Sequence, residues 1–276
     1  MTTHLRPAGA ERREPDGGRT RAFAVCVNGR PVGEVELATA PRLGSATGRV
    51  RTLRIQRSER GRGRGTVAAL AAEEVLRGWG CREILLSLDP RAEVGLRLAA
   101  ALGYTETGRT MAKELAAVPK LPPGSAVRPM AAGEYPGWRT AEVEAYARHW
   151  LDQGTPPDEA RSRAGAAHDA LLPAGAATPD MALRVLEHEG AGVGTVWIAL
   201  KPEIATGGYV YAVTVAPEHR GRGHGRTLML AAERECLAAG LPTLGLHVFA
   251  WNEVARRLYE SLDYAPTAYH LRKPLI

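Results

Sequence analysis

The sequence has few of the residues on which disulfide frameworks and zinc sites depend. Its 276 residues include three cysteines, Cys26, Cys81 and Cys236. Their number is odd, they lie far apart and no C-x-x-C pair occurs, so we expect buried free thiols and no metal site. No apolar run approaches the roughly 18 residues of a membrane span. The amino-terminal segment also lacks the apolar core of a secretory signal, so we expect a cytoplasmic protein with no membrane partner.

Lysine is also scarce, because only Lys113, Lys120, Lys201 and Lys273 occur. Arginine therefore supplies most of the positive charge, as high-GC coding would produce. The net charge of +6 indicates an affinity for anions but does not identify the anion. A composition of 45% hydrophobic and 24% charged residues is typical of a folded globular protein and excludes a disordered chain.

One glycine-rich run occurs twice. The run Arg60-Gly61-Arg62-Gly63-Arg64-Gly65 recurs 160 residues later as Arg220-Gly221-Arg222-Gly223-His224-Gly225. The same offset relates Tyr104 to Tyr264 and Lys113 to Lys273 without a gap. A shared register over this distance indicates two copies of one fold. The proline-rich segment 117–124 reads as a linker. We therefore expect a flexible tail over residues 1–19, a first domain over 20–117 and a second over 125–276.

Both copies show the same order of predicted elements. In the first copy, strands over residues 22–27 and 32–37 flank Asn28-Gly29, a strong hairpin signal. The other elements of the first copy are a strand ending near 55, a helix at 65–79, a strand at 84–88, a helix ending at 102 and a strand at 107–115. Those of the second copy are expected at 181–187, 193–199, 209–215, 225–239, 243–248, 252–262 and near 269.

The second copy alone carries two further predicted helices, at residues 133–152 and 157–172. The first copy has only a short polar segment before its hairpin, so it is truncated where the second is complete. The predicted fold class is α/β, with two tandem mixed β-sheets flanked by helices.

Each glycine-rich run connects a predicted strand to a predicted helix. Glycines let backbone amides approach an anion closely, and a helix N-terminus adds partial positive charge. A solvated basic loop or an RNA-binding Arg-Gly segment are alternatives for a single run. Neither explains why the run occurs twice in the same place, and no aromatic residues interleave with the arginines. The residues that follow, Gly65-Thr66 and Gly225-Arg226, do not match the Gly-Lys-Ser/Thr of a P-loop.

The pattern R-x-x-G-x-G between a strand and a helix resembles the acetyl-CoA pyrophosphate loop of the GNAT superfamily of N-acetyltransferases. Residues 252–264, NEVARRLYESLDY, resemble the family's signature N-x-x-A-x-x-L-Y-x-x-L-G-[FY], with Asp263 in place of the usual glycine. The resemblance covers nearly all of residues 125–276 and, less well, residues 20–115. The tandem arrangement resembles the mycothiol synthases and the two-domain acetyltransferases that inactivate amine-bearing antibiotics.

The resemblance implies direct acetyl transfer from acetyl-CoA to an amine. Tyr259 matches the tyrosine that protonates the departing thiolate, and we expect its pKa near the ordinary value of about 10. Asn252 matches an asparagine at the pantetheine arm, and it also suits a helix N-cap. His247 is the candidate general base by its titration range, with Glu203 and Tyr211 as alternatives. A packing role for Tyr259 and an outward-facing position for His247 stay open.

The resemblance also implies a set of residues that bind acetyl-CoA. The backbone of the strand before the second run would pair with the pantetheine amides, and both runs would hold phosphates. The candidates are Val213, Thr214, Val215, Arg220, Gly221, Arg222, Gly223, His224, Gly225, Arg226, Asn252, Tyr259, Arg60, Gly61, Arg62, Gly63, Arg64 and Gly65.

The two copies differ at the catalytic candidates. At the common offset, Asn252 falls on Ala92 and Tyr259 falls on Ala99. We therefore expect the second copy to be the enzyme and the first to be degenerate. The first copy could still bind acetyl-CoA or serve only as a pseudo-dimer partner.

The extra helices of the second copy carry an excess of acidic residues. Such a wall favours a cationic amine as acceptor, although an ordinary solvated face explains it equally well. The acidic residues are Glu134, Glu142, Glu144, Asp152, Asp158, Glu159 and Asp169, against Arg139, Arg148, Arg161 and Arg163.

The predicted function is acetyl-CoA-dependent N-acetylation of a primary amine on a small molecule such as an amino sugar, an antibiotic or an amine metabolite. Acetylation of protein lysines or N-termini is an alternative. A non-catalytic acyl-CoA sensor or nucleic-acid-binding module is an alternative from another class, but Tyr259 and Asn252 argue against it, so nucleic acid is not an expected partner. The chain is expected to act as a monomeric pseudo-dimer or a homodimer.

Overall fold

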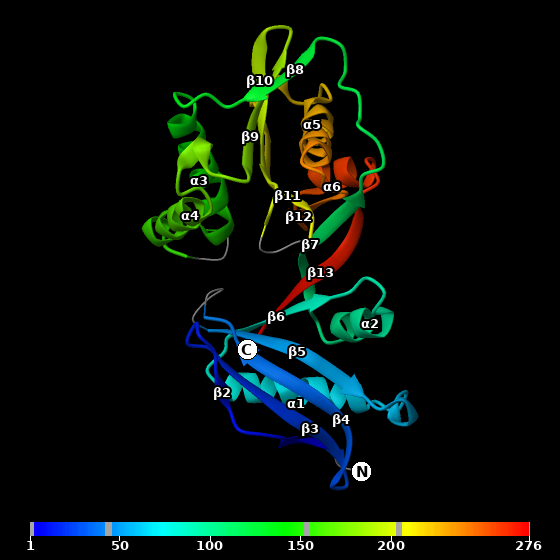
Figure 1. Ribbon diagram of the computed structural model, residues 1–276. Helices are drawn as coiled ribbons and strands as arrows, with labels where there is room; N and C mark the ends of the chain where they lie inside the picture. Colours follow the sequence, from blue (N-terminus) through cyan, green and yellow to red (C-terminus); the bar gives the residue numbers. More distant parts are fainter. Residues whose placement is uncertain (1–2, 42–45, 152–154, 203–205, 276) are drawn as a thin grey trace. The chain divides into compact units, whose positions relative to one another are not determined.

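The computed structural model describes residues 3–41, 46–151, 155–202 and 206–275, which form two compact units. Unit 1 comprises residues 1–110, 248–252 and 266–276, and unit 2 comprises residues 111–247 and 253–265. Each unit is built of strands and helices, as Figure 1 shows. This confirms the predicted α/β class, with mixed β-sheet flanked by helices in each unit.

Unit 1 contains a sheet in the order β1-β3-β4-β5-β6-β13, with the short β2 also paired to β3. Helix α1 packs on one face of this sheet through a core that includes Leu37, Leu76 and Ile84, all fully buried. The elements are β1 (Thr3–Pro7), β2 (Arg12–Arg13), β3 (Arg19–Val27), β4 (Arg30–Thr39), β5 (Thr47–Ile55), η1 (Arg57–Glu59), α1 (Arg64–Gly78), β6 (Glu83–Leu88), α2 (Glu93–Ala101) and β13 (Ala265–Pro274).

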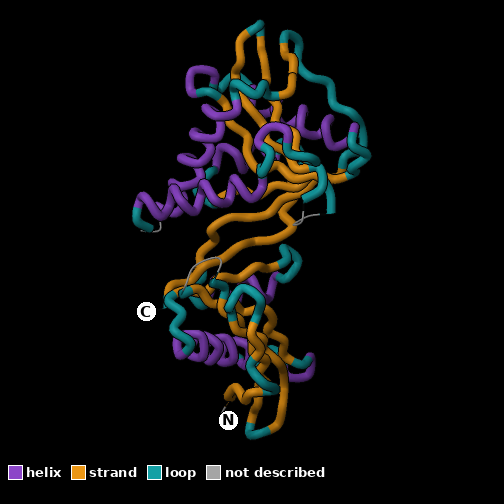
Figure 2. The backbone as a smooth tube through the Cα atoms, turned by 60° about the vertical axis from the view of Figure 1, so that its left-hand side comes forward, coloured by secondary structure: helices purple, strands orange, loops and turns teal. Residues whose placement is uncertain are grey.

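The sheet of unit 2 follows the order β7-β12-β11-β10-β9-β8, with β7 contributing residues 111–114 and β12 residues 243–247 to the unit. Helices α3 and α4 lie on one face of it and α5 and α6 on the other, and Figure 2 gives a second view of these layers. The elements are β7 (Thr105–Glu114), β8 (Ser125–Pro129), α3 (Tyr135–Leu151), α4 (Pro157–Leu171), η2 (Gly175–Ala177), β9 (Met181–His188), β10 (Ala191–Ala199), β11 (Gly208–Val215), η3 (Pro217–His219), α5 (His224–Ala238), β12 (Thr243–Phe249) and α6 (Glu253–Glu260).

The two copies exchange their last strands. The end of β7 comes from the first copy but pairs within unit 2, where the Leu115 amide donates to the Pro242 carbonyl at 2.7 Å. The end of β13 comes from the second copy but pairs with β6 in unit 1, where the Leu275 amide donates to the Arg82 carbonyl at 2.7 Å. The units therefore differ from a linear division at 20–117 and 125–276, because local strand patterns do not specify which sheet a strand joins.

Each exchanged strand brings a lysine to a buried glutamate. In unit 2, Lys113 Nζ lies 2.8 Å from Glu233 Oε1, which also accepts a hydrogen bond from the Tyr264 hydroxyl at 3.2 Å. In unit 1, Lys273 Nζ lies 2.7 Å from Glu73 Oε2. The two pairs are related by the 160-residue offset, so the exchange preserves the repeat's internal symmetry.

The prediction of a flexible tail over residues 1–19 is wrong for its described part. Residues Thr3–Pro7 form β1, which pairs antiparallel with β3 from Thr3 opposite Val27 to Pro7 opposite Phe23. Leu5 packs against the core of unit 1. Too few apolar residues occur in this segment to show a strand period, so the pairing partner rather than the pattern creates the strand.

The hairpin and cysteine predictions are confirmed. Asn28 and Gly29 have φ values of 49° and 80°, and the corresponding turn of unit 2, Glu189-Gly190, has 52° and 83°. Both turns need left-handed backbone at two positions, which favours Asn and Gly in the first. Cys26, Cys81 and Cys236 are free and buried.

Candidate active site

The second glycine-rich run forms an open cradle of backbone amides between β11 and α5. Gly221 and Gly223 have φ values of 74° and 85°, and the first helical hydrogen bond of this turn runs from the Thr227 amide to the Gly223 carbonyl at 3.1 Å. Within the described residues, the amides of residues 221–226 have no hydrogen-bond partner, and Gly223 caps the helix without a side chain. Unpartnered amides at a helix N-terminus fit a phosphate group.

The first run has the same geometry. Gly61 and Gly63 have φ values of 71° and 72°, and the Val67 amide donates to the Gly63 carbonyl at 3.1 Å. The Nε of Arg60 donates to the Ile55 carbonyl at 2.9 Å, as Arg220 does to Val215 at 3.2 Å. The two loops are therefore equivalent in backbone conformation and in the hydrogen bond that fixes their first arginine.

Several predicted loop side chains contact other parts of the fold. His224 is buried, with its ring centroid 4.9 Å from that of His188, and burial is the main cause that lowers its pKa. Arg226 donates to Ser261 Oγ at 2.6 Å. Arg64 is buried and paired with Glu59. The buried side chains of His224 and Arg64 are therefore not available to an anion, whereas Arg222 and Arg226 are exposed, and Arg222 has no ion pair among the described residues.

Strands β11 and β12 separate beside this cradle. Their parallel pairing covers Gly208 to Val210 opposite Leu244 to Leu246 and then ends. Residues 212–215, which include the predicted Val213, Thr214 and Val215, stay paired to β10, so one backbone edge of this segment has no strand beside it among the described residues. Such an edge can hydrogen-bond an extended amide-bearing chain.

A bulge and His247 mark the point of separation. The β10–β11 register shifts between Trp197 and Ile198, which leaves Tyr211 as the extra residue of β11. His247 follows Leu246 directly and is half-buried. The structure therefore brings His247 and Tyr211 to the same end of the paired segment. Glu203, the other candidate base, lies outside the described residues.

Tyr259 lies on α6, which packs against the first turn of α5. The closest approach is at Gly225, where a Cβ would lie 3.2 Å from Leu258 Cδ2. The Tyr259 side chain is buried, and no described residue hydrogen-bonds its hydroxyl. Burial raises the pKa of Tyr259 to about 12, so the expectation of an ordinary value near 10 is wrong. Asn252 immediately precedes α6, in the position of an N-cap. Its backbone N–H donates to the Phe249 carbonyl at 3.0 Å.

Aromatic side chains cover the α3/α4 side of the separated strands. Tyr211 lies 4.7 Å from Trp197 and 5.1 Å from Tyr209 between ring centroids. Trp197 continues the cluster to His168 of α4 at 5.0 Å and to Trp138 of α3 at 5.8 Å. This group joins the core formed by Met130, Leu172, Leu183 and Val185.

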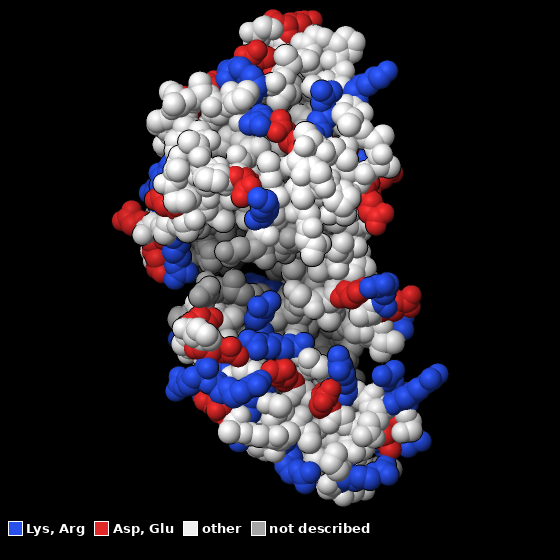
Figure 3. All heavy atoms as spheres, viewed as in Figure 1, with Lys and Arg blue, Asp and Glu red and all other residues white. Residues whose placement is uncertain are grey.

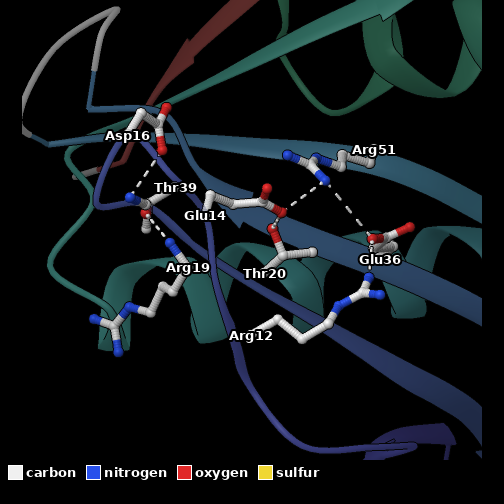
Figure 4. A network of polar contacts seen from close by, with 9 residues as sticks. Arg12, Glu14, Asp16, Arg19, Thr20, Glu36, Thr39 and Arg51 are labelled. Carbon is white, nitrogen blue, oxygen red and sulfur yellow. Dashed lines mark hydrogen bonds and ion pairs between the residues drawn. The ribbon is translucent and has the colours of Figure 1, made fainter.

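The corresponding face of unit 1 is polar. In unit 1 the bulge lies between the pairs Glu36–Thr52 and Leu37–Val50, which leaves Arg51 as the extra residue. Arg51 is therefore the equivalent of Tyr211. Glu36 is the equivalent of Trp197. Arg51 Nη1 lies 3.2 Å from Glu14 Oε1 and 3.9 Å from Glu36 Oε1, and Glu14 accepts a hydrogen bond from Thr20 at 2.7 Å. Figure 4 shows this network.

Unit 1 has no helix before its hairpin among the described residues, and this face of its sheet carries charged side chains where unit 2 carries rings. Figure 3 shows basic and acidic side chains over this unit.

Most of the predicted acidic wall of unit 2 is neutralised by ion pairs. Five of its acids are paired with arginines: Glu134 with Arg128, Glu144 and Asp158 with Arg161, Glu159 with Arg163 and Asp169 with Arg139. Asp152 lies outside the described residues. Glu142 is the exception, because it is buried and hydrogen-bonded only to Thr214 among the described residues. In the sequence Glu142 is one acid among several on these helices, and its burial was not predicted.

Comparison with known proteins decides the family. The profile of the acetyltransferase (GNAT) family matches residues 3–104 and 141–264. The chain belongs to the GNAT family of acetyltransferases.

Relatives and solved structures agree with this family. The chain is 31% identical to the uncharacterized N-acetyltransferase YycN of Bacillus subtilis over 150 residues, 53% of this chain and 96% of that protein. It is 28% identical over 250 residues to a mycothiol acetyltransferase of Thermomonospora curvata, covering 90% of this chain and 80% of that one.

The fold is shared with two larger GNAT structures at 20% identity. A GCN5-related N-acetyltransferase from Sphaerobacter thermophilus matches with a TM-score of 0.59 over 92% of this chain and 80% of that chain. A tandem GNAT protein from the clavulanic acid biosynthesis pathway matches with a TM-score of 0.52 over 96% and 85%. The protein is therefore an acyltransferase of tandem GNAT architecture. None of its described helices is long and apolar enough to cross a membrane.

Proposed function

We propose that this GNAT protein transfers the acetyl group of acetyl-CoA to a primary amine, and that unit 2 carries out the reaction. The observation that carries the proposal is the combination, within unit 2, of an unpartnered amide cradle, a separated pair of parallel strands and a buried tyrosine on the helix docked beside them. Unit 1 keeps the cradle but has alanines at the two catalytic positions, Ala92 and Ala99.

The residues of unit 2 fit acetyl-CoA. The amides of residues 221–226 suit its pyrophosphate, exposed Arg222 adds positive charge, and the open edge of β11 at Val213 to Val215 suits the amides of its pantetheine arm. When bound, acetyl-CoA supplies an acetyl group activated as a thioester.

The side chains at the separated strands would manage two protons. As the amine nitrogen forms its bond to the acetyl carbon and the carbon–sulfur bond breaks, the amine loses a proton and the thiolate needs one. Tyr259, whose raised pKa keeps it protonated at neutral pH, would donate to the sulfur. His247 would accept the amine proton, directly or through water. Asn252 would hold the start of α6 and thereby the position of Tyr259.

A small-molecule acceptor is proposed over a protein. The support is the name of the mycothiol acetyltransferase relatives, which match most of the chain, including both copies. Acetylation of protein lysines or N-termini is the alternative, and it predicts turnover on peptides rather than on small amines. We propose that the chain acts as a monomeric pseudo-dimer; the exchange of last strands between the two copies supports this.

The test is calorimetric titration of acetyl-CoA into the wild type and into Gly223→Val and Gly63→Val. Each substitution forces a β-branched residue into left-handed backbone at the same point of one cradle. Loss of a binding event in Gly223→Val supports donor binding by unit 2, and loss of a second event in Gly63→Val assigns another donor site to unit 1. Absence of any binding by the wild type contradicts the proposal.

A further inference from the structure

Four glutamates are buried among the described residues, and three of them are paired with a basic side chain. Glu73 is paired with Lys273, Glu233 with Lys113, and Glu59 with Arg30 and Arg64. Glu142 is 9% exposed and accepts one hydrogen bond, from Thr214 Oγ1 at 2.7 Å, with no ion pair in the described part of the chain. Burial of a carboxylate without a cation is costly, so such a group is retained where something else supplies the charge.

Glu142 lies on the face of α3 that meets β11. Thr214, its partner, belongs to the segment of β11 that has separated from β12. Tyr146, one helical turn further along α3, is close enough to Tyr209 of β11 to affect its pKa. Glu142 therefore contacts β11 close to Tyr211, the bulge residue at the point of separation. This places the carboxylate beside the strand on which we propose that the acetyl donor lies.

The surroundings of Glu142 suit an organic cation. Tyr146 follows Glu142 one turn later on α3, and Tyr209 and Tyr211 of β11 lie 5.1 Å apart between ring centroids. No arginine forms an ion pair with Glu142 among the described residues. The other described acids of α3 and α4 are mostly exposed and engaged with arginine. Aromatic faces and a carboxylate together form a site for an ammonium group.

We propose that Glu142 binds the ammonium group of the acceptor, so that the substrate is a primary amine without a carboxylate adjacent to its nitrogen. This inference rests on the proposed function and specifies the class of amine. An α-amino acid brings its own carboxylate within a few ångströms of Glu142, and like charges in a buried site repel strongly. Amino sugars and alkylamines carry no such charge. Glu142 would act by direct contact with the amine, and Thr214 would position its carboxylate.

The experiment compares Glu142→Gln, Thr214→Val and the control Glu144→Gln. Glu144 is on the same helix, two residues away, and is exposed and paired with Arg161. The acceptors are glucosamine, butylamine and glycine, with thiol release from acetyl-CoA as the readout and donor affinity measured by calorimetry. We expect kcat/KM for glucosamine and butylamine to fall about 10- to 150-fold in Glu142→Gln, the worth of one charged hydrogen bond. Donor affinity and the control should stay unchanged, and glycine should be a poor acceptor of the wild type.

The pH profile separates charge recognition from a structural role. Burial raises the pKa of Glu142, and the Thr214 hydroxyl lowers it in part. The ratio of wild-type to Glu142→Gln kcat/KM should be large above this pKa and approach one below it, where the wild-type carboxyl is also neutral. Thr214→Val should move the midpoint of that change to higher pH. A pH-independent ratio, or an unchanged KM for the amine in Glu142→Gln, overturns the inference.

A binding measurement decides the ammonium site even without turnover. Butylamine and glucosamine, added in the presence of CoA, should raise the melting temperature of the wild type and of Glu144→Gln but not of Glu142→Gln. Equal shifts in all three proteins, or none in any, refute the ammonium site. Thiol release from none of the amines by a wild type that shows the selective shift instead counts against the proposed function alone.

Discussion

Replacing Lys113 by methionine should destabilise unit 2 strongly, because it leaves Glu233 as a buried carboxylate without a cation. Glu233 is 3% exposed, and its remaining partner is the Tyr264 hydroxyl at 3.2 Å. Breaking a buried ion pair from one side costs roughly 3–5 kcal/mol. The side chain of Lys113 is 21% exposed and that of Glu233 4%, so the lysine can recover hydration while the glutamate cannot. We therefore expect Lys113→Met to cost about 3 kcal/mol and Glu233→Gln about 1–2 kcal/mol.

The assay is urea unfolding followed by far-UV circular dichroism, with Lys120→Met as the control. Lys120 is exposed and has no ion pair among the described residues. The double variant Lys113→Met/Glu233→Gln should be more stable than Lys113→Met alone, because the orphaned charge is gone. Lys273→Met should show the same effect in unit 1, where Glu73 is the partner. A cost for Lys113→Met that equals the control's would refute both the pairing and the strand exchange that produces it.

Three further predictions follow from the same geometry. Tyr259→Phe should lower kcat roughly 10²- to 10⁴-fold, because the substitution removes the proposed proton donor. The calorimetric affinity for acetyl-CoA should change less than twofold, because the ring is kept. Equal losses in affinity and kcat would indicate a packing role. Deletion of residues 1–18 should lower the melting temperature and speed proteolysis of unit 1, because β1 pairs with β3 and Leu5 packs on the core of that unit. A truncated protein as stable as the full chain would instead support a flexible tail. Burial lowers the pKa of His168, so the folded state favours its neutral form. The stability that the neutral ring contributes is complete above the ordinary pKa of about 6.5 and is lost as pH falls toward the lowered value. In thermal melts, the wild type should therefore lose more stability than His168→Gln between pH 7 and pH 5.

The sequence repeat predicted the architecture well where the signal was local. Both glycine-rich runs, the Asn28-Gly29 hairpin and the helices at α3 and α4 have signatures within a few residues, because glycine, turn chemistry and helical periodicity act over one or two turns. The α/β class and the tandem organisation followed from these. The pairing partners of β7 and β13 could not be predicted, because both strands carry the same local pattern whichever strand they pair with.

The sequence predicted which positions form the candidate site, but not how buried their side chains are. The repeat and the family resemblance located the cradle and Tyr259, but the pKa of Tyr259 depends on burial by neighbours distant in sequence. Glu142 was missed because a glutamate on a helix is usually solvated. A signal was present: Trp138, Glu142, Tyr146 and Trp150 recur every four residues, which puts the carboxylate on an aromatic row of α3.

The most direct test of the account is amine-dependent release of CoA thiol from acetyl-CoA by the wild type, Gly223→Val and Gly63→Val under identical conditions. We expect turnover by the wild type and by Gly63→Val, with turnover abolished in Gly223→Val, because we propose that only the cradle of unit 2 holds the donor beside Tyr259. Turnover that survives in Gly223→Val and disappears in Gly63→Val would contradict it and assign the chemistry to unit 1.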